Sequence, residues 1–283
     1  MSKTATTWQL MKDSWGVLTR DKELVVFPVV SSVACFLVLL TFIVPFLGAN
    51  FIGLGRIVRG QSTALVYVVL FCYYLCNFFV VFFFNAALVD FVMTRLRGGE
   101  PTLGASLRAA TACLPQIAAW ALIASTVGVV LKALSNRAGF IGRIVIALIG
   151  VAWALVTYFV VPIIVIERKG AVESIGASKD LLAKTWGKQI VSGLGFGLVG
   201  FLLTVPAIVV ILAAIFGAIT EGHVGGFAAL VVAAVLYVIG LGIVMSTLRS
   251  IFGVVLYHFA STGEAPAGFS ATDLSAAIQP SRA

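Results

Sequence analysis

Charged residues are scarce in this chain, and their scarcity excludes a soluble globular protein. Only 11% of its 283 residues are Asp, Glu, Lys or Arg, whereas 61% are hydrophobic. Soluble globular chains carry about a quarter charged residues, so this chain could not cover its surface with polar groups. Such a composition suits lipid as the solvent, because apolar side chains then need not be hidden from water.

The residues of common catalytic and metal sites are also few. The chain has two histidines, His223 and His258, and neither has carboxylates or cysteines at ligand spacing. It has no Walker loop and no Gly-x-Ser-x-Gly nucleophile turn. We therefore expect no enzymatic activity, no catalytic residue, no metal ion and no cofactor, and a lipid-modifying enzyme is the least favoured function.

Cysteine is rare as well. Four cysteines occur, Cys35, Cys72, Cys76 and Cys113, and all fall within or at the edge of apolar runs. This placement does not fit an extracellular disulfide framework. We interpret them as small buried side chains.

Long apolar runs are what the chain does have. A membrane-spanning helix needs about 20 mostly apolar residues. Six runs qualify, namely Leu24–Leu47, Ala64–Val92, Leu114–Leu134, Phe140–Ile166, Ile190–Ile219 and Phe227–Phe259. The first follows a charged segment and is too long for a cleavable signal, so we interpret it as a retained span. The sequence predicts an all-α, polytopic bundle of about six transmembrane helices.

The basic residues orient this bundle. The net charge is +8, which we attribute to cytoplasmic loops rather than to nucleic-acid binding. The segments before the first span, after the second and fourth spans and at the C-terminus hold thirteen cations, against five in the other connections. This bias predicts a cytoplasmic (inner) membrane protein with both termini in the cytoplasm. Its segments would be a cytoplasmic amphipathic segment (1–23), a six-span domain (24–259) and a cytoplasmic tail (260–283).

Each odd-numbered span is preceded by a segment with helical periodicity, typical of an in-plane amphipathic helix. In the third such segment, Val172, Ile175 and Leu182 fall on one stripe. Tryptophan and lysine suit headgroup depth. We therefore predict contacts to lipid headgroups, which we expect to be anionic, by Trp8, Trp15, Lys179, Lys184, Trp186 and Lys188.

Two of these segments resemble each other. "GASLRAATACLPQI" begins at Gly104 and "GASKDLLAKTWGKQI" at Gly176, while "GEP" and "GEAP" follow two even-numbered spans. We infer a degenerate unit of in-plane helix plus helical hairpin that is used about three times. Such repeats are known in transporter folds, but gene duplication also leaves them in proteins that transport nothing.

Four short motifs carry a resemblance to a known family. They are "SW" at Ser14, "DKELVVFP" over Asp21–Pro28, "YFVVPIIV" over Tyr158–Val165 and "KTWG" over Lys184–Gly187. Together they resemble a bacterial six-helix membrane family of unknown function, over roughly residues 8–260. The architecture is also similar to the membrane portion attached to some glycerophosphodiester phosphodiesterases, which is not their catalytic portion. The resemblance implies a fold and a membrane, but no activity and no site.

Arg249 lies inside the last apolar run, where a charge is costly. If that span enters lipid at Phe227, Arg249 reaches the cytoplasmic interface after about 20 residues. If Tyr257 and His258 mark the interface, Arg249 is buried and needs a partner, for which Asp90 is the natural candidate. Asn85, Asp90 and Arg249 are therefore candidates for a structural ion pair or a polar cytoplasmic mouth.

Prolines and glycines mark helix geometry. We predict kinks at Pro162 and Pro206. Gly193 and Gly197 give a GxxxG spacing that favours close helix packing, within the bundle or between subunits of a homo-oligomer.

Two functions remain open. The first is a non-enzymatic membrane protein that organises lipid or partner proteins. The alternative is a transporter or channel for a small solute or lipid.

Overall fold

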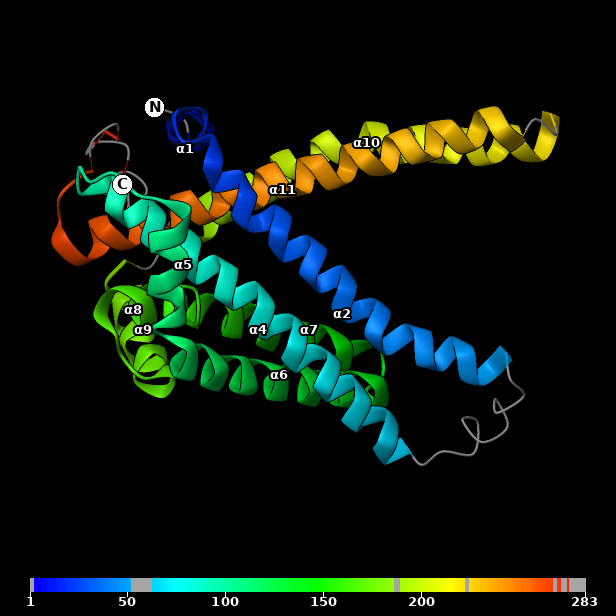
Figure 1. Ribbon diagram of the computed structural model, residues 1–283, viewed down its shortest axis with the longest axis horizontal. Helices are drawn as coiled ribbons and strands as arrows, with labels where there is room; N and C mark the ends of the chain where they lie inside the picture. The colour runs from blue at the N-terminus through cyan, green and yellow to red at the C-terminus, as the bar shows by residue number, and fades with distance from the viewer. Residues whose placement is uncertain are drawn as a thin grey trace. The chain divides into compact units, whose positions relative to one another are not determined.

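The chain is predominantly helical in the part that the computed structural model describes, which comprises residues 3–51, 63–185, 189–221, 224–266, 269–270 and 274. No strand occurs among these residues (Figure 1). Six helical segments in them are long and apolar enough to cross a membrane. The predicted all-α fold with six spans is confirmed.

Spans and shorter helices follow the predicted order. The shorter helices α1 (Lys3–Arg20), α5 (Leu103–Thr111) and α9 (Ala171–Thr185) precede the odd-numbered spans. A 3-10 turn, η1 (Lys22–Val25), leads into the first span. The spans are α2 (Val26–Phe51), α4 (Thr63–Leu96), α6 (Leu114–Arg137), α7 (Phe140–Val156) with α8 (Val160–Glu167), α10 (Gln189–Glu221) and α11 (Val224–Thr262).

Large apolar side chains cover the outside of the spans. In α7 no residue is buried, and Phe140 and Ile141 at its start are 80% and 77% exposed. An apolar surface of this extent is unfavourable in water and favourable in hydrocarbon. The exposed faces therefore agree with lipid as the solvent of these helices.

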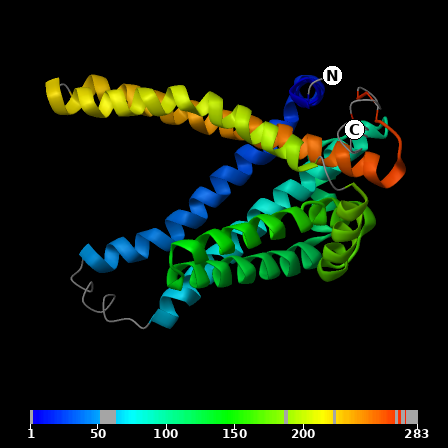
Figure 2. The same ribbon diagram turned by 180° about the vertical axis from the view of Figure 1, so that it is seen from behind.

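The chain divides into two compact units, and the first consists of Met1–Val25 and Thr185–Ala283. In it α10 and α11 run side by side as a long helical hairpin (Figure 1, Figure 2). The Tyr237 hydroxyl of α11 donates a hydrogen bond to the Leu203 carbonyl of α10 at 3.1 Å. Helix α1 packs against both helices, and η1 packs against α11.

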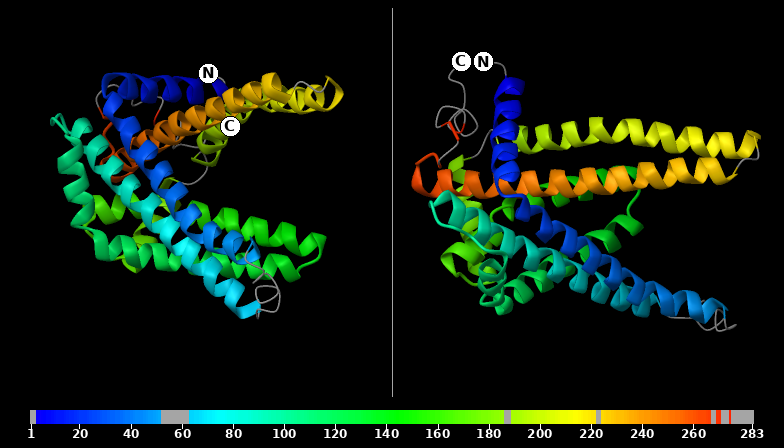
Figure 3. Two further views of the ribbon diagram at one scale, coloured as in Figure 1. Left: turned by 45° about the vertical axis from the view of Figure 1, so that its right-hand side comes forward. Right: turned by 45° about the horizontal axis from the view of Figure 1, so that its top comes forward.

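The second unit, Val26–Lys184, is built around α4. Helix α4 packs against α2, α5, α6 and α8, and α7 lies along α6 (Figure 3). Phe82 of α4 stacks on Trp120 of α6 with ring centroids 5.5 Å apart, and Trp120 stacks on Trp153 of α7 at 6.0 Å. Residues 86–89 and 91–93 of α4 are buried, so the densest packing lies toward the C-terminal end of α4.

The fourth span is interrupted, although its sequence is one continuous apolar run. Helix α7 ends at Val156 and α8 begins at Val160. The Ser178 hydroxyl of α9 donates to the Val156 carbonyl at 2.6 Å and accepts from the Phe159 amide at 3.1 Å. One buried hydroxyl therefore satisfies both a carbonyl and an amide at the interruption.

Three even-numbered spans end in the same backbone conformation. Gly98 follows α4 with φ +80°, Arg168 follows α8 with φ +57°, and Gly263 follows α11 with φ +78°. A left-handed residue is a common end to a helix, and glycine adopts it without the steric cost that a side chain incurs. Among the described residues, Arg168 alone adopts positive φ without being glycine.

Candidate functional site

A polar cluster lies inside the second unit where α4, α5, α6 and α8 meet. We call it the polar junction, and its members are Asp90, Arg97, Ser106, Cys113 and Arg168. The half-buried carboxylate of Asp90 interacts with the Ser106 hydroxyl and lies within electrostatic range of Arg168 and Arg97. The Ser106 hydroxyl is fully buried. The Ser106 hydroxyl first, and then the guanidinium groups of Arg168 and Arg97, stabilise the negative charge of this carboxylate.

Arg168 joins the end of α8 to the α5–α6 connection. Its guanidinium donates to the Ala109 carbonyl at 3.2 Å and to the Cys113 sulfur at 2.8 Å. The Cys113 thiol in turn lies 3.7 Å from the Ile164 carbonyl, which it can donate to. These contacts hold Arg168 in a left-handed conformation that costs about 1–2 kcal/mol in a residue with a side chain.

The sequence did not single out Arg168, Ser106 or Cys113 as functional residues. One signal was available: the paired "GAS" segments place Ser106 and Ser178 at equivalent positions in the inferred repeat. In the structure both serines are buried, and each contacts the even-numbered span that precedes it in the chain. Ser178 bridges the interruption of the fourth span, whereas Ser106 faces Asp90.

The predicted polar mouth is distributed over both units. Asn85 and Asp90 are half-buried in α4. Arg249 lies in α11, where its side chain is exposed, and no ion pair of Arg249 occurs with the described residues. Because Arg249 belongs to the other compact unit, its pairing with Asp90 stays a prediction.

The predicted kink positions differ from each other in the structure. Pro162 lies in the first turn of α8, where a missing amide hydrogen is tolerated. The interruption at residues 157–159 comes just before it, because proline offers no amide hydrogen to the carbonyl four residues earlier. Pro206 lies inside α10, which continues on both sides of it. Gly193 and Gly197 also belong to α10, but their surroundings lie outside the described part.

The predicted headgroup residues are only partly described. Trp15 is 50% exposed, and Lys179 is exposed on α9. Trp8 and Lys184 are helical residues whose side chains lie outside the described part, as do Trp186 and Lys188 altogether.

The buried face of α9 is not the predicted stripe. Val172 is 74% exposed, whereas Ala171, Ser174, Ser178 and Leu182 are buried. The predicted stripe was assigned to a surface helix in the headgroup region, and the exposure of Val172 does not contradict that assignment. Ser174 is buried without any hydrogen-bond partner for its hydroxyl in the described residues.

Helix α1 has two unlike faces. Leu10, Met11, Ser14 and Leu18 are buried, and the Ser14 hydroxyl donates back to the Leu10 carbonyl at 2.8 Å. On the other side Lys12, Trp15 and Arg20 are exposed. A half-exposed tryptophan between two cations is the composition of an interfacial helix face.

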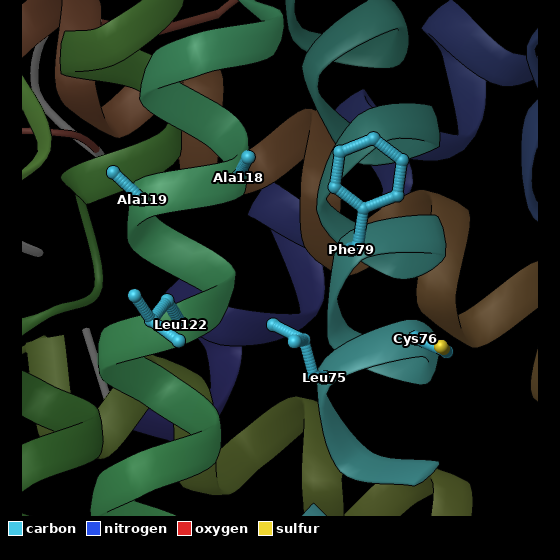
Figure 4. Close-up of a pocket in the computed structure, with 6 residues that line it drawn as sticks. All are labelled: Leu75, Cys76, Phe79, Ala118, Ala119 and Leu122. Carbon is cyan, nitrogen blue, oxygen red and sulfur yellow. The ribbon is translucent and has the colours of Figure 1, made fainter. Parts of the chain in front are cut away.

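An apolar groove of about 450 Å³ lies between α4 and α6 in the second unit (Figure 4). It is lined by Leu75, Cys76, Phe79, Ala118, Ala119 and Leu122. Cys76 is exposed in this groove, and Cys72 one turn earlier is also exposed. The prediction of buried cysteines is therefore wrong for these two, because their face of α4 is turned outward, and right for Cys113.

Charged groups near the end of α8 form an ion pair. The Lys169 ammonium lies 2.6 Å from the Glu167 carboxylate. This hydrogen bond and the carboxylate charge raise the pKa of Lys169, so the residue stays cationic over the physiological range. Within the described residues, no three His, Cys, Asp or Glu side chains are grouped closely enough to hold a metal ion.

These features define the class of protein: an all-helical chain with six spans of the length and apolarity of a multi-pass membrane protein. A family model described as a family of unknown function (DUF6159) matches residues 64–269. This match covers well over half of the 283 residues, and the chain belongs to that family. No curated protein is significantly similar to the chain. No solved structure is significantly similar to it either.

Proposed function

We propose that the protein is a non-enzymatic component of the cytoplasmic membrane that organises anionic lipids at its cytoplasmic surface. One observation carries this proposal: α1 buries one face and exposes Lys12, Trp15 and Arg20 on the other. In a membrane this exposed face fits the headgroup layer, where tryptophan and basic residues are stabilised.

The lipid composition around the full-length protein tests the proposal. The protein would be extracted in polymer-bounded native nanodiscs, and its lipids would be quantified against the bulk membrane. We expect enrichment of anionic phospholipid, since each basic residue near an anionic surface contributes about 1 kcal/mol, a factor of about five. A wild-type lipid shell identical to the bulk membrane would contradict the proposal.

A matched pair of variants locates the effect. Lys12→Glu with Arg20→Glu reverses two charges on α1, and we expect it to lower the enrichment. Lys132→Glu with Arg137→Glu makes the same change at two exposed positions near the end of α6, on the predicted outer side. We expect this control to leave the enrichment unchanged, and equal losses in both variants would refute a role for α1.

The proposed orientation has an independent test. We place both termini in the cytoplasm because cations concentrate in the connections on that side. A reporter that is active only in the cytoplasm, fused after Ala283, should be active. The same reporter inserted after Glu221, where α10 ends, should be inactive.

A transporter or channel is the second candidate, and the polar junction is the observation in its favour. An acid and two guanidinium groups near a span end resemble the lining of a solute or ion pathway. We expect solute flux in liposomes to fall in Asp90→Ala and Arg168→Ala. Flux that survives both substitutions would exclude a solute pathway at these residues and at the neighbouring Asn85.

A further inference from the structure

Helix α1 borders a second apolar groove, which lies wholly within the first unit. This α1 groove has a volume of about 690 Å³. Helix α1 contributes Met11, Lys12 and Trp15, α10 contributes Val199 and Leu203, and α11 lines the groove from Tyr237 to Leu248. All three helices belong to one compact unit, so the groove is a property of that unit.

The groove has the length and the apolar lining expected of a binding site for an acyl chain. Tyr237 and Leu248 are eleven residues apart, which is about 16 Å along a helix at about 1.5 Å per residue. Its walls are nearly all apolar, so a polar solute would lose hydration there without gaining hydrogen bonds. An extended acyl chain loses no such hydration and gains van der Waals contacts with these walls.

The lining of the groove includes a charged group. Lys12 is the single charged residue among those that line it, and its side chain is exposed. Trp15 lies one turn further along α1 and is half exposed. An ammonium group beside an amphipathic ring suits a phosphate at the boundary between headgroup and hydrocarbon.

We propose that the α1 groove binds one anionic phospholipid, with an acyl chain along α10 and α11 and the phosphate at Lys12. This inference rests on the proposed function, because it places α1 at headgroup depth. It goes further by assigning a single saturable site in place of a general enrichment of lipid. It also assigns α1 the role of closing that site against the hairpin.

Glycine keeps the groove open at Gly240. A Cβ built there meets no atom within 4 Å, so a larger side chain enters the groove instead of clashing with protein. Gly242 is two residues away on the same helix, is equally unobstructed and does not line the groove. Gly240→Leu and Gly242→Leu therefore form a matched pair. Both add the same side chain to α11, but only Gly240→Leu adds it to the lining of the groove.

Native mass spectrometry of the full-length protein in detergent tests the site. The protein would be titrated with phosphatidylglycerol or phosphatidylcholine carrying the same acyl chains. We expect one tightly bound phosphatidylglycerol, preferred about fivefold over phosphatidylcholine because of one lysine. Gly240→Leu should weaken binding about tenfold, because its side chain occupies the space of the acyl chain, whereas Gly242→Leu should bind like the wild type.

Two further pairs keep the test decisive. Lys12→Gln should abolish the preference for phosphatidylglycerol, whereas Lys22→Gln, an exposed lysine outside the groove, should retain it. If Gly240→Leu does not fold, Leu203→Trp fills the groove from α10. Leu202→Trp, at an exposed neighbour that does not line the groove, is its control.

The outcomes separate this inference from the function it rests on. Equal binding by Gly240→Leu and Gly242→Leu, or full displacement of the lipid by soluble glycerol phosphate, would overturn the groove site. Equal affinity of the wild type for both lipids would overturn the role of Lys12. If native mass spectrometry shows a bound lipid but native nanodiscs show no enrichment, the proposed function is refuted and the groove site is retained.

Discussion

The Ser178 hydroxyl accepts a hydrogen bond from the Phe159 amide at 3.1 Å, across the interruption of the fourth span. The same oxygen donates to the carbonyl of Val156 at 2.6 Å. A helix that stops inside an apolar run leaves such groups unpaired, and each buried unpaired group costs about 1–3 kcal/mol. The Ser178 side chain of α9 therefore completes the hydrogen bonding of the fourth span at its interruption.

Ser178→Ala should lower the free energy of unfolding by about 1–3 kcal/mol, because it leaves the Phe159 amide and the Val156 carbonyl without their partner. Ser174→Ala is the matched control on the same helix. Ser174 is equally buried, and its hydroxyl has no hydrogen-bond partner among the described residues. We expect it to be neutral or stabilising. Unfolding by sodium dodecyl sulfate in mixed micelles measures both, and equal losses would contradict the bridging role.

Arg168 combines a strained backbone with stabilising side-chain contacts, and two substitutions separate these effects. Arg168→Ala removes the hydrogen bonds to Ala109 and Cys113 and keeps the strain, so we expect a loss of about 1–2 kcal/mol. Arg168→Gly removes the same contacts but relieves the left-handed conformation, and should be about 1 kcal/mol more stable than the alanine variant. Equal stability of the two variants would show that the backbone there is unstrained.

Alanine should have opposite effects at two kinds of glycine. Gly98 and Gly263 have φ of +80° and +78°, so Gly98→Ala or Gly263→Ala should destabilise by about 1–2 kcal/mol. Gly176 lies inside α9 with open space around it, so Gly176→Ala should stabilise by up to about 1 kcal/mol. Thermal unfolding in detergent distinguishes the signs. A neutral Gly98→Ala would mean that the turn after α4 has another conformation.

Asp90 offers a test of which arginine balances its charge. A double-mutant cycle of Asp90→Ala with Arg168→Ala should show a coupling of about 0.5–3 kcal/mol, the range for residues in one network. A second cycle with Arg249→Ala tests the ion pair predicted from the sequence. Additive effects in the first cycle would exclude the polar junction as an electrostatic unit.

The spans were predictable because the length and apolarity of each run can be read from that stretch of sequence alone. Each apolar run in the sequence corresponds to helix, and the short helices before the odd-numbered spans appear where periodicity placed them. The interruption of the fourth span was not predictable in this way. Hydropathy is continuous through Thr157, and the hydroxyl that bridges the interruption comes from Ser178, about twenty residues later.

The polar junction depends on contacts that are distant in sequence. Arg168 meets Cys113 across 55 residues, and no spacing rule connects the two. Asp90 was identified because an acid in an apolar run is conspicuous, whereas Arg168 and Ser106 lie in polar segments where such residues are common. The exposure of Val172 and Cys76 likewise depends on which neighbours each helix meets, which periodicity alone does not specify.

The depth of Trp15 in a bilayer tests the central claim most directly. A variant with Trp15 as its sole tryptophan, the other four replaced by phenylalanine, would be reconstituted with lipids brominated at defined positions along the chain. We predict that bromines nearest the headgroup quench its fluorescence most, because α1 lies in the interface with its exposed face toward anionic lipid. Strongest quenching by bromines near the chain ends, or no quenching at any depth, would contradict the account.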